Sequence, residues 1–285
     1  NKAMEYAQKS LLNNQYNIES LQLLAVIYRI QKETAKATAL LNRIKTIDPL
    51  NHFSDFEKYY SDNTVDSKEK FTSQIQNEMP VQTYLELGIW YYELNCKAEA
   101  LAVFSSAPSD PEIIYWKAFL ENTTVNLNNI QPGTTFPFRS ETVGILEKLI
   151  SSNNHWMLKY HLAMILWNRN DSLRAKLLFL QCGTEPTDPN FYAARAALMK
   201  DNEDFAETDL LKAIALNKKE WRYNKLLAEH YIVQKQYAKA LSIAEPFYKN
   251  HADNYIIGML YAKILLLNKK FSAADAFLTK LKILP

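Results

Sequence analysis

The chain has 285 residues, of which 48% are hydrophobic, 12% are aromatic and only five are glycine, and this composition indicates a folded, non-fibrous protein. Its 33 basic and 31 acidic residues give a net charge of +2 with no long basic run, which argues against a nucleic-acid partner. No apolar stretch is long enough to span a membrane. Cys96 and Cys182 are too few for a disulfide framework and lack metal-ligand spacing, so we interpret both as small side chains inside the fold.

Residues 18–51 contain two successive apolar stripes with helical spacing, and the Asp48-Pro49 pair ends the second. Neither helix buries its stripe alone, so we expect the two to pack as an antiparallel hairpin. Residues 1–17 match only the second helix of such a pair. We therefore expect the chain to open inside a repeat and to be a fragment of a longer protein. The stripe residues are Leu21, Leu24, Ala25, Tyr28, Ala37, Leu41 and Ile44.

The same two-stripe pattern recurs along the rest of the chain. It is degenerate at first, and it is interrupted once by a long loop, residues 121–139, in which Asn, Thr, Pro and Gly break the periodicity. Small residues at the eighth and twentieth positions of each repeat would let the paired helices approach closely. At the end of the chain, Leu278, Leu281 and Ile283 are expected to stay partly uncovered or to meet a neighbour. The predicted repeats are 52–80, 81–110, 111–155, 156–186, 187–220, 221–254 and 255–285.

The repeat at 81–110 shows the pattern most clearly. It reads Tyr84-x-x-Leu87-Gly88-x-x-Tyr91, followed by Ala100, Phe104, Ala107 and Pro111. This resembles the tetratricopeptide (TPR) repeat, a helix–turn–helix unit of about 34 residues. The resemblance implies an all-α fold in which residues 1–285 form a single right-handed TPR-like superhelix, or solenoid.

Four further strings resemble a narrower group of proteins. They look like the C-terminal TPR region of large bacterial proteins, common in Bacteroidetes, in which a β-sandwich domain similar to galactose mutarotase precedes the repeats. That resemblance implies a link to carbohydrate metabolism, and it spans roughly residues 45–200. The strings are Tyr84-Leu85-Glu86-Leu87, Tyr115-Trp116, Phe136-Pro137-Phe138-Arg139-x-Glu141-Thr142 and Trp156-x-x-Lys159-Tyr160.

The first helix of each TPR unit has a second face, opposite the core stripe, that would line a concave groove. An apolar and aromatic patch that grades into basic groups suits a protein segment as ligand. The alternative is that the fold, or the loop 121–139, buries these aromatic residues. The groove candidates are Met157, Tyr160, Met164, Trp167, Phe191, Arg195, Arg222 and Lys225.

Two other candidate sites can be weighed from the sequence. In the loop, Phe136 and Phe138 are expected to tuck against the repeats while Arg139 binds a carboxylate. The alternative is that the three residues latch onto the missing N-terminal domain. A clamp for a C-terminal carboxylate, as in chaperone-binding TPR domains, needs Lys and Asn four residues apart. Lys225 is followed by Glu229 instead, so we reject that clamp.

Motifs for catalysis are missing from the sequence. The five histidines are scattered without metal spacing, and neither a phosphate-binding glycine loop nor a nucleophile elbow occurs. We therefore expect no catalytic residue, no metal and no cofactor. The preferred function is an interaction module for a protein segment or for the missing domain. The alternatives are a structural or dimerisation role and an all-α carbohydrate-active enzyme, whose carboxylate pair could assemble without a motif. No signal peptide is visible, which favours the cytoplasm, while the oligomeric state stays open.

Overall fold

The computed structural model describes residues 2–128, 130–133 and 135–280, and these form seventeen α-helices and no strand. The chain divides into two compact units, residues 1–125 and 126–285, whereas the repeat pattern predicts one solenoid over residues 1–285. Leu281 and Ile283 lie outside the described residues, and the Leu278 side chain is exposed.

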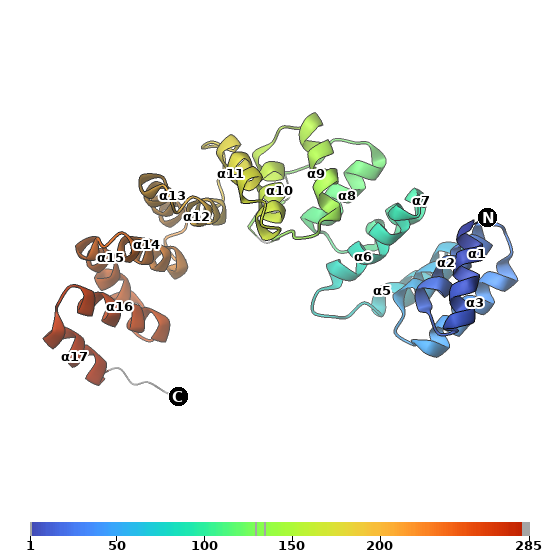
Figure 1. Ribbon diagram of the computed structural model, residues 1–285, viewed down its shortest axis with the longest axis horizontal. Coiled ribbons are helices and arrows are strands. Elements are labelled where there is room, and N and C mark those ends of the chain that lie inside the picture. The colour runs from blue at the N-terminus through green and yellow to red at the C-terminus, as the bar shows by residue number, and fades with distance from the viewer. Residues whose placement is uncertain (1, 129, 134, 281–285) are drawn as a thin grey trace. The chain divides into compact units, whose positions relative to one another are not determined.

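Unit 1 consists of helices α1 to α8, in which α2 packs on α3, α4 on α5 and α6 on α7 as hairpins (Figure 1). Side-chain caps and prolines define several helix starts. Asn17 and Asn51 cap α2 and α4, Thr64 forms a capping box on α5, and Pro80 and Pro111 occupy the first turns of α6 and α8. The helices are α1 (Lys2–Asn13), α2 (Ile18–Ile30), α3 (Thr34–Ile47), α4 (His52–Asp62), α5 (Val65–Ser73), α6 (Pro80–Glu93), α7 (Lys97–Ser106) and α8 (Pro111–Glu121).

Unit 2 continues the hairpin pattern with helices α9 to α17. The loop between α8 and α9 begins after Glu121, the last residue of α8, and ends before Glu141. The helices are α9 (Glu141–Ser152), α10 (Trp156–Asn168), α11 (Ser172–Gln181), α12 (Pro189–Leu198), α13 (Glu203–Leu216), α14 (Trp221–Val233), α15 (Tyr237–Asn250), α16 (Tyr255–Leu267) and α17 (Phe271–Lys280).

The turn inside the hairpin is a repeated structural element. In five repeats its fifteenth residue adopts a left-handed conformation, and the next backbone N–H donates to the carbonyl five residues before it. This arrangement satisfies a carbonyl at the end of the first helix and reverses the chain. The five left-handed residues are Lys32, Asn95, Asn170, Lys235 and Lys269.

Small residues mark the contact between the two helices of these five hairpins. The eighth and twentieth positions hold alanine or glycine in every case, and the alanines are buried. Gly88 on α6 faces the buried ring of Phe104 on α7, and a Cβ atom at position 88 would overlap that ring. The helices therefore meet where the repeat pattern predicts, and the fold is an all-α solenoid of TPR-like hairpins. The paired positions are Ala25 and Ala37, Gly88 and Ala100, Ala163 and Ala175, Ala228 and Ala240, and Ala262 and Ala274.

Candidate functional site

The groove face expected in unit 2 is partly filled by its own side chains. Met157, Tyr160 and Phe191 are buried, so the expectation that they line an open surface is wrong. The Tyr160 ring lies 5.8 Å from that of Phe179 and 5.4 Å from that of Phe191, measured between centroids. Neighbouring hairpins therefore enclose these aromatic residues in a core, which was the alternative interpretation of the sequence.

Arg195 is also buried, although a basic residue on a groove face was expected to be exposed. Its Nε and Nη2 atoms donate to the two carboxylate oxygens of Asp209 at 2.7 and 2.8 Å, and its Nη1 donates to the Gly183 carbonyl at 2.7 Å. Such a pair needs several hydrogen bonds to offset the loss of hydration. Arg195 therefore holds α12 against α13 and does not face a ligand.

The α8–α9 loop contacts the first helices of two hairpins in unit 2. Nε2 of His161 on α10 lies 3.1 Å from the Pro132 carbonyl, and the Asn190 side chain on α12 donates to the Gly133 carbonyl at 3.5 Å. Since a carbonyl only accepts, His161 carries its proton on Nε2. Burial lowers the pKa of His161 to about 4, and the bond to Pro132 offsets part of that effect. The loop is thus fixed to this face through its backbone.

The remaining groove candidates are accessible. Met164 and Trp167 are half-buried and line a shallow depression of about 360 Å³ with Asn168. Arg222 is exposed and bonds Glu220, while Lys225 pairs with Glu229 at 2.8 Å. Met164 and Trp167 belong to α10, whereas Arg222 and Lys225 belong to α14 and do not line that depression.

Phe136 and Phe138 do not tuck against the helices. Their side chains are 56% and 45% exposed, so that expectation is wrong, while Pro137 between them is buried. The Arg139 guanidinium lies over the Phe138 ring, 5.8 Å from its centroid. Alternating side chains of an extended loop point to opposite sides, so burying Pro137 exposes both of its neighbours.

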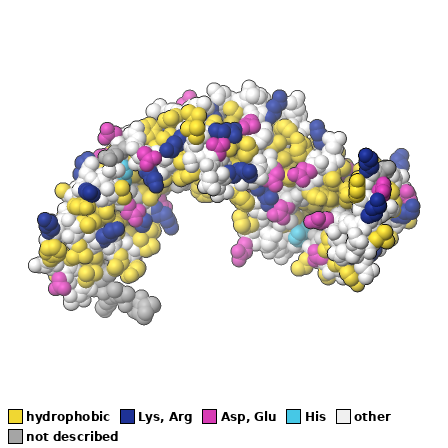
Figure 2. All heavy atoms as spheres, in the orientation of Figure 1, with side chains coloured by type: hydrophobic (Ala, Val, Ile, Leu, Met, Phe, Trp, Pro, Cys, Tyr) yellow, Lys and Arg dark blue, Asp and Glu magenta, His cyan; other side chains and the backbone are white. Residues whose placement is uncertain are grey.

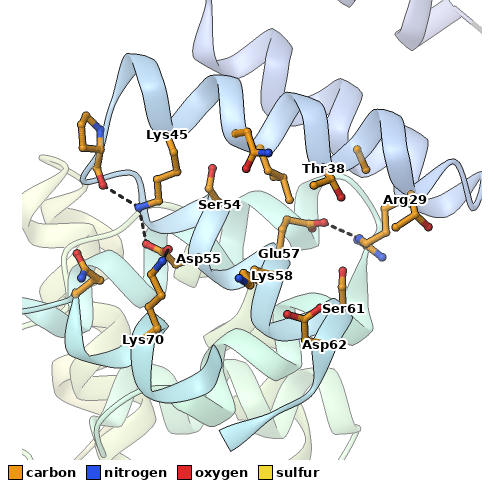
Figure 3. Close-up of a pocket in the computed structure, with 16 residues that line it drawn as sticks. Arg29, Thr38, Lys45, Ser54, Asp55, Glu57, Lys58, Ser61, Asp62 and Lys70 are labelled. Atoms are coloured by element: carbon orange, nitrogen blue, oxygen red, sulfur yellow. Dashed lines mark hydrogen bonds and ion pairs between the residues drawn. The ribbon is translucent and has the colours of Figure 1, made fainter. Parts of the chain in front are cut away.

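A larger cavity, of about 770 Å³, lies in unit 1 between α2, α3, α4 and α5, and we call it the polar groove (Figure 3). One wall is the face of α4 that carries Ser54, Lys58, Ser61 and Asp62, which are spaced to share one side of a helix. Thr38 is an exposed residue of its α3 wall. Sequence reasoning missed this site because residues 52–80 match the repeat poorly, although the polar spacing on α4 was a usable signal.

Ion pairs hold one end of the polar groove. Lys45 of α3 donates to Asp55 of α4 at 2.6 Å and to the Pro49 carbonyl at 2.8 Å. Lys70 of α5 reaches the other Asp55 oxygen at 4.0 Å (Figure 3). Asp55 is buried, so its two lysine contacts compensate a charge that is removed from water. This end of the groove is therefore fixed by contacts among three helices.

The other end is held by a network centred on Arg29 of α2. Arg29 donates to Glu57 of α4 at 2.7 Å and to Glu99 of α7 at 2.8 Å, and the Tyr91 hydroxyl of α6 donates to Glu57 at 2.6 Å. Burial would lower the pKa of Arg29, but the two carboxylates raise it above its ordinary value. Burial and the Glu57 charge raise the pKa of Tyr91, which keeps its hydroxyl protonated as a donor.

One polar atom of the groove lacks a partner. The Ser54 hydroxyl is buried, and it makes no hydrogen bond within the described part of the chain. A buried hydroxyl without a partner costs free energy, so its position on the wall of a polar cavity suits hydrogen bonding to whatever fills that cavity. The cavity volume lies in the range of ligand sites, about 300–1,000 Å³.

Other kinds of site are not apparent in the described residues. They hold no cluster of three or more His, Cys, Asp or Glu side chains that could bind a metal, and none of their helices is long and apolar enough to cross a membrane. Burial raises the pKa of Cys182 to about 12, which keeps that thiol protonated and unreactive. On the face seen in Figure 2, basic and acidic side chains are interspersed in each unit.

Comparisons with known proteins find similarity only among solved structures. No model of a known protein family matches the chain, and no curated protein matches it. A thermophilic TPR protein of Thermus thermophilus is 19% identical, with 65% of this chain and 98% of that chain covered and a TM-score of 0.39. A tetratricopeptide repeat protein of Parabacteroides merdae is 15% identical, with 70% and 78% covered and a TM-score of 0.43. MamA of Desulfovibrio magneticus is 16% identical, with 61% and 96% covered and a TM-score of 0.39. Because these TM-scores lie below 0.5, the fold assignment rests on the helices described above.

Proposed function

We propose that this chain is an interaction module that binds a protein segment in the polar groove of unit 1. The observation that carries the proposal is a cavity of about 770 Å³ whose wall holds the buried, unpartnered Ser54 hydroxyl. Hydroxyl, amide and charged groups line this cavity, and these are the groups that bond a peptide backbone and its polar side chains.

The groove is preorganised for binding. Ion pairs between different helices position Arg29, Lys45 and Asp55 before any ligand arrives, so a ligand need not order them. Walls that are already ordered lower the entropic cost of association. The interaction role therefore follows from rigid helical hairpins that present side chains at fixed spacing.

The test uses a displayed library of linear 12-residue peptides that is selected against the full chain. Thr38→Trp places a large side chain in the groove from an exposed position of α3. Thr46→Trp makes the same change at an exposed position of α3 outside the groove and is the matched control. We expect selected peptides to lose at least about tenfold in affinity, or about 1.4 kcal/mol, on Thr38→Trp alone. A library without enrichment, or equal binding to both variants, would overturn the proposal.

The origin of the segment is a finer prediction. A separate protein, or the sugar-related domain that the sequence resemblance places N-terminal to the repeats, would supply it. The two sources can be separated by fusing that domain to the chain and repeating the peptide titration. A segment within the domain would compete with the added peptide and weaken its apparent affinity, whereas a segment from a separate protein would not. A dimerisation role predicts instead that the isolated chain self-associates, which sedimentation measures. Binding at Met164, Trp167, Arg222 and Lys225, and a latch at Phe136, Phe138 and Arg139, stay predictions.

A further inference from the structure

The two ends of the polar groove carry opposite excess charge. At one end, Lys45 and Lys70 flank Asp55, while Lys58 lies on α4 between this end and Asp62 (Figure 3). Lys58 is exposed and makes no ion pair with another described residue. Lys45 and Lys70 around a single carboxylate leave one positive charge uncompensated, and we call this the lysine end.

The other end has the reverse balance. Arg29 is the cation there, and its guanidinium is already bonded to Glu57 and Glu99. Asp62, at the end of α4, lines the cavity and forms no ion pair in the described part of the chain. One arginine among three carboxylates leaves two negative charges, and we call this the acidic end.

The separation of the ends follows from helix geometry. Asp55 and Asp62 are seven residues apart on α4, which corresponds to about 10 Å at about 1.5 Å per residue. An extended peptide advances about 3.3 Å per residue. Successive side chains of an extended ligand point to opposite sides, so only side chains two or four residues apart can both face the groove. Those spacings, about 7 and 13 Å, bracket the distance between the lysine end and the acidic end.

We infer that the polar groove selects an extended segment that carries an acidic and a basic side chain two or four residues apart, on the same face. The acidic side chain binds the lysine end, where the Ser54 hydroxyl donates an additional hydrogen bond, and the basic side chain binds beside Asp62. This inference rests on the proposed function, and it adds the chemical class of the segment. Complementary charges of this kind increase the specificity and the association rate of a complex more than they increase its affinity.

The experiment compares peptides obtained from the library with synthetic versions in which Asp and Glu become Asn and Gln, and Lys and Arg become Gln. We expect the selected peptides to share an acidic and a basic residue at one of these spacings. Their affinity should fall about tenfold when either charge is removed. The affinity of the unmodified peptides should also fall with added salt, because salt screens surface charges.

Charge reversal in the protein locates the effect. Lys70→Glu and Asp62→Lys alter the two ends of the groove, whereas Lys68→Glu and Asp66→Lys make the same charge changes on α5 outside the lining. Lys70→Glu should weaken binding about tenfold only for peptides that keep their acidic residue, and Asp62→Lys only for those that keep their basic residue. The two control variants should leave binding within about twofold.

The possible outcomes separate this inference from the proposed function. The inference would be overturned if Thr38→Trp weakens binding of peptides that lack the charge pair, or of peptides whose affinity neither charge reversal changes. The interaction module would then still stand. Equal losses in the groove variants and the controls would show a long-range charge effect and would also overturn it. Peptides that Thr38→Trp does not exclude would remove the proposed function itself.

Discussion

Gly88→Ala tests the contact on which the hairpin packing depends. In a helix interior, alanine is normally more stable than glycine by about 1 kcal/mol. At position 88 the new methyl group would overlap the Phe104 ring, which is buried and has the Trp116 ring beside it, so the ring has little room to move. Overpacking of this kind costs about 1–3 kcal/mol. We therefore expect α6 and α7 to be destabilised by up to about 2 kcal/mol.

Gly144→Ala is the matched control, because Gly144 also lies within a helix, α9, and a Cβ atom there meets nothing within 4 Å. This change should stabilise α9 by about 0.5–1 kcal/mol. Native-state hydrogen exchange measures both local free energies without assuming that the two units unfold together. If Gly88→Ala stabilises its helix as much as Gly144→Ala does, the close helix contact and the packing argument are refuted.

Three further predictions concern unit 2. Tyr160→Ala should lower the free energy of unfolding by about 3–5 kcal/mol, measured by urea denaturation, because Tyr160 is buried. Trp167 is partly exposed, so Trp167→Ala should cost much less. Equally small losses in both variants would contradict the burial of Tyr160. His161 has a folded pKa of about 4, below an unfolded value of about 6.5, so the unfolded state takes up the proton first and stability falls as the pH drops from about 6.5 to 4. At pH 5 the free energy of unfolding of the unmodified protein should be about 2 kcal/mol lower than at pH 7.5, and His161→Gln should not show this loss. If stability falls equally with pH in both proteins, His161 is not its cause. Asp209→Asn leaves Arg195 charged and buried without its counter-ion, which should cost about 3–5 kcal/mol in denaturant titrations, and a neutral result would mean that water reaches the guanidinium.

The sequence predicted the hairpin cores well because their contacts are local. Gly88, Ala100 and Phe104 lie within one repeat, so their spacing alone places them at the contact. The exposure of Tyr160 was predicted wrongly because it depends on Phe191 of the next repeat. The burial of Arg195 was missed for a different reason: its partner, Asp209, lies in the same repeat, but the repeat pattern marks only apolar and small core positions.

The polar groove could not be found from repeat matching. It lies against α4 and α5, where the pattern is degenerate, and positions that normally hold apolar residues carry polar ones. A single sequence does not show whether polar residues at helical spacing face water or a cavity. Only the packing of α2 and α3 beside α4 distinguishes Ser54, which is buried, from Ser61, which is exposed.

The network around Arg29 also affects how unit 1 unfolds. In an ideal repeat array each unit contacts only its neighbours, so the array can fray one repeat at a time. Arg29 connects the repeat 18–51 directly to Glu99 in the repeat 81–110, while Glu57 of the intervening repeat bonds both Arg29 and Tyr91. Loss of the repeat 18–51 leaves Glu57 and Glu99 without their cation, and loss of either other repeat removes one of the two carboxylates that hold Arg29. Residues 18–110 are therefore expected to melt as one cooperative block, so that partial unfolding from the end of the array cannot open the groove without disrupting all three repeats.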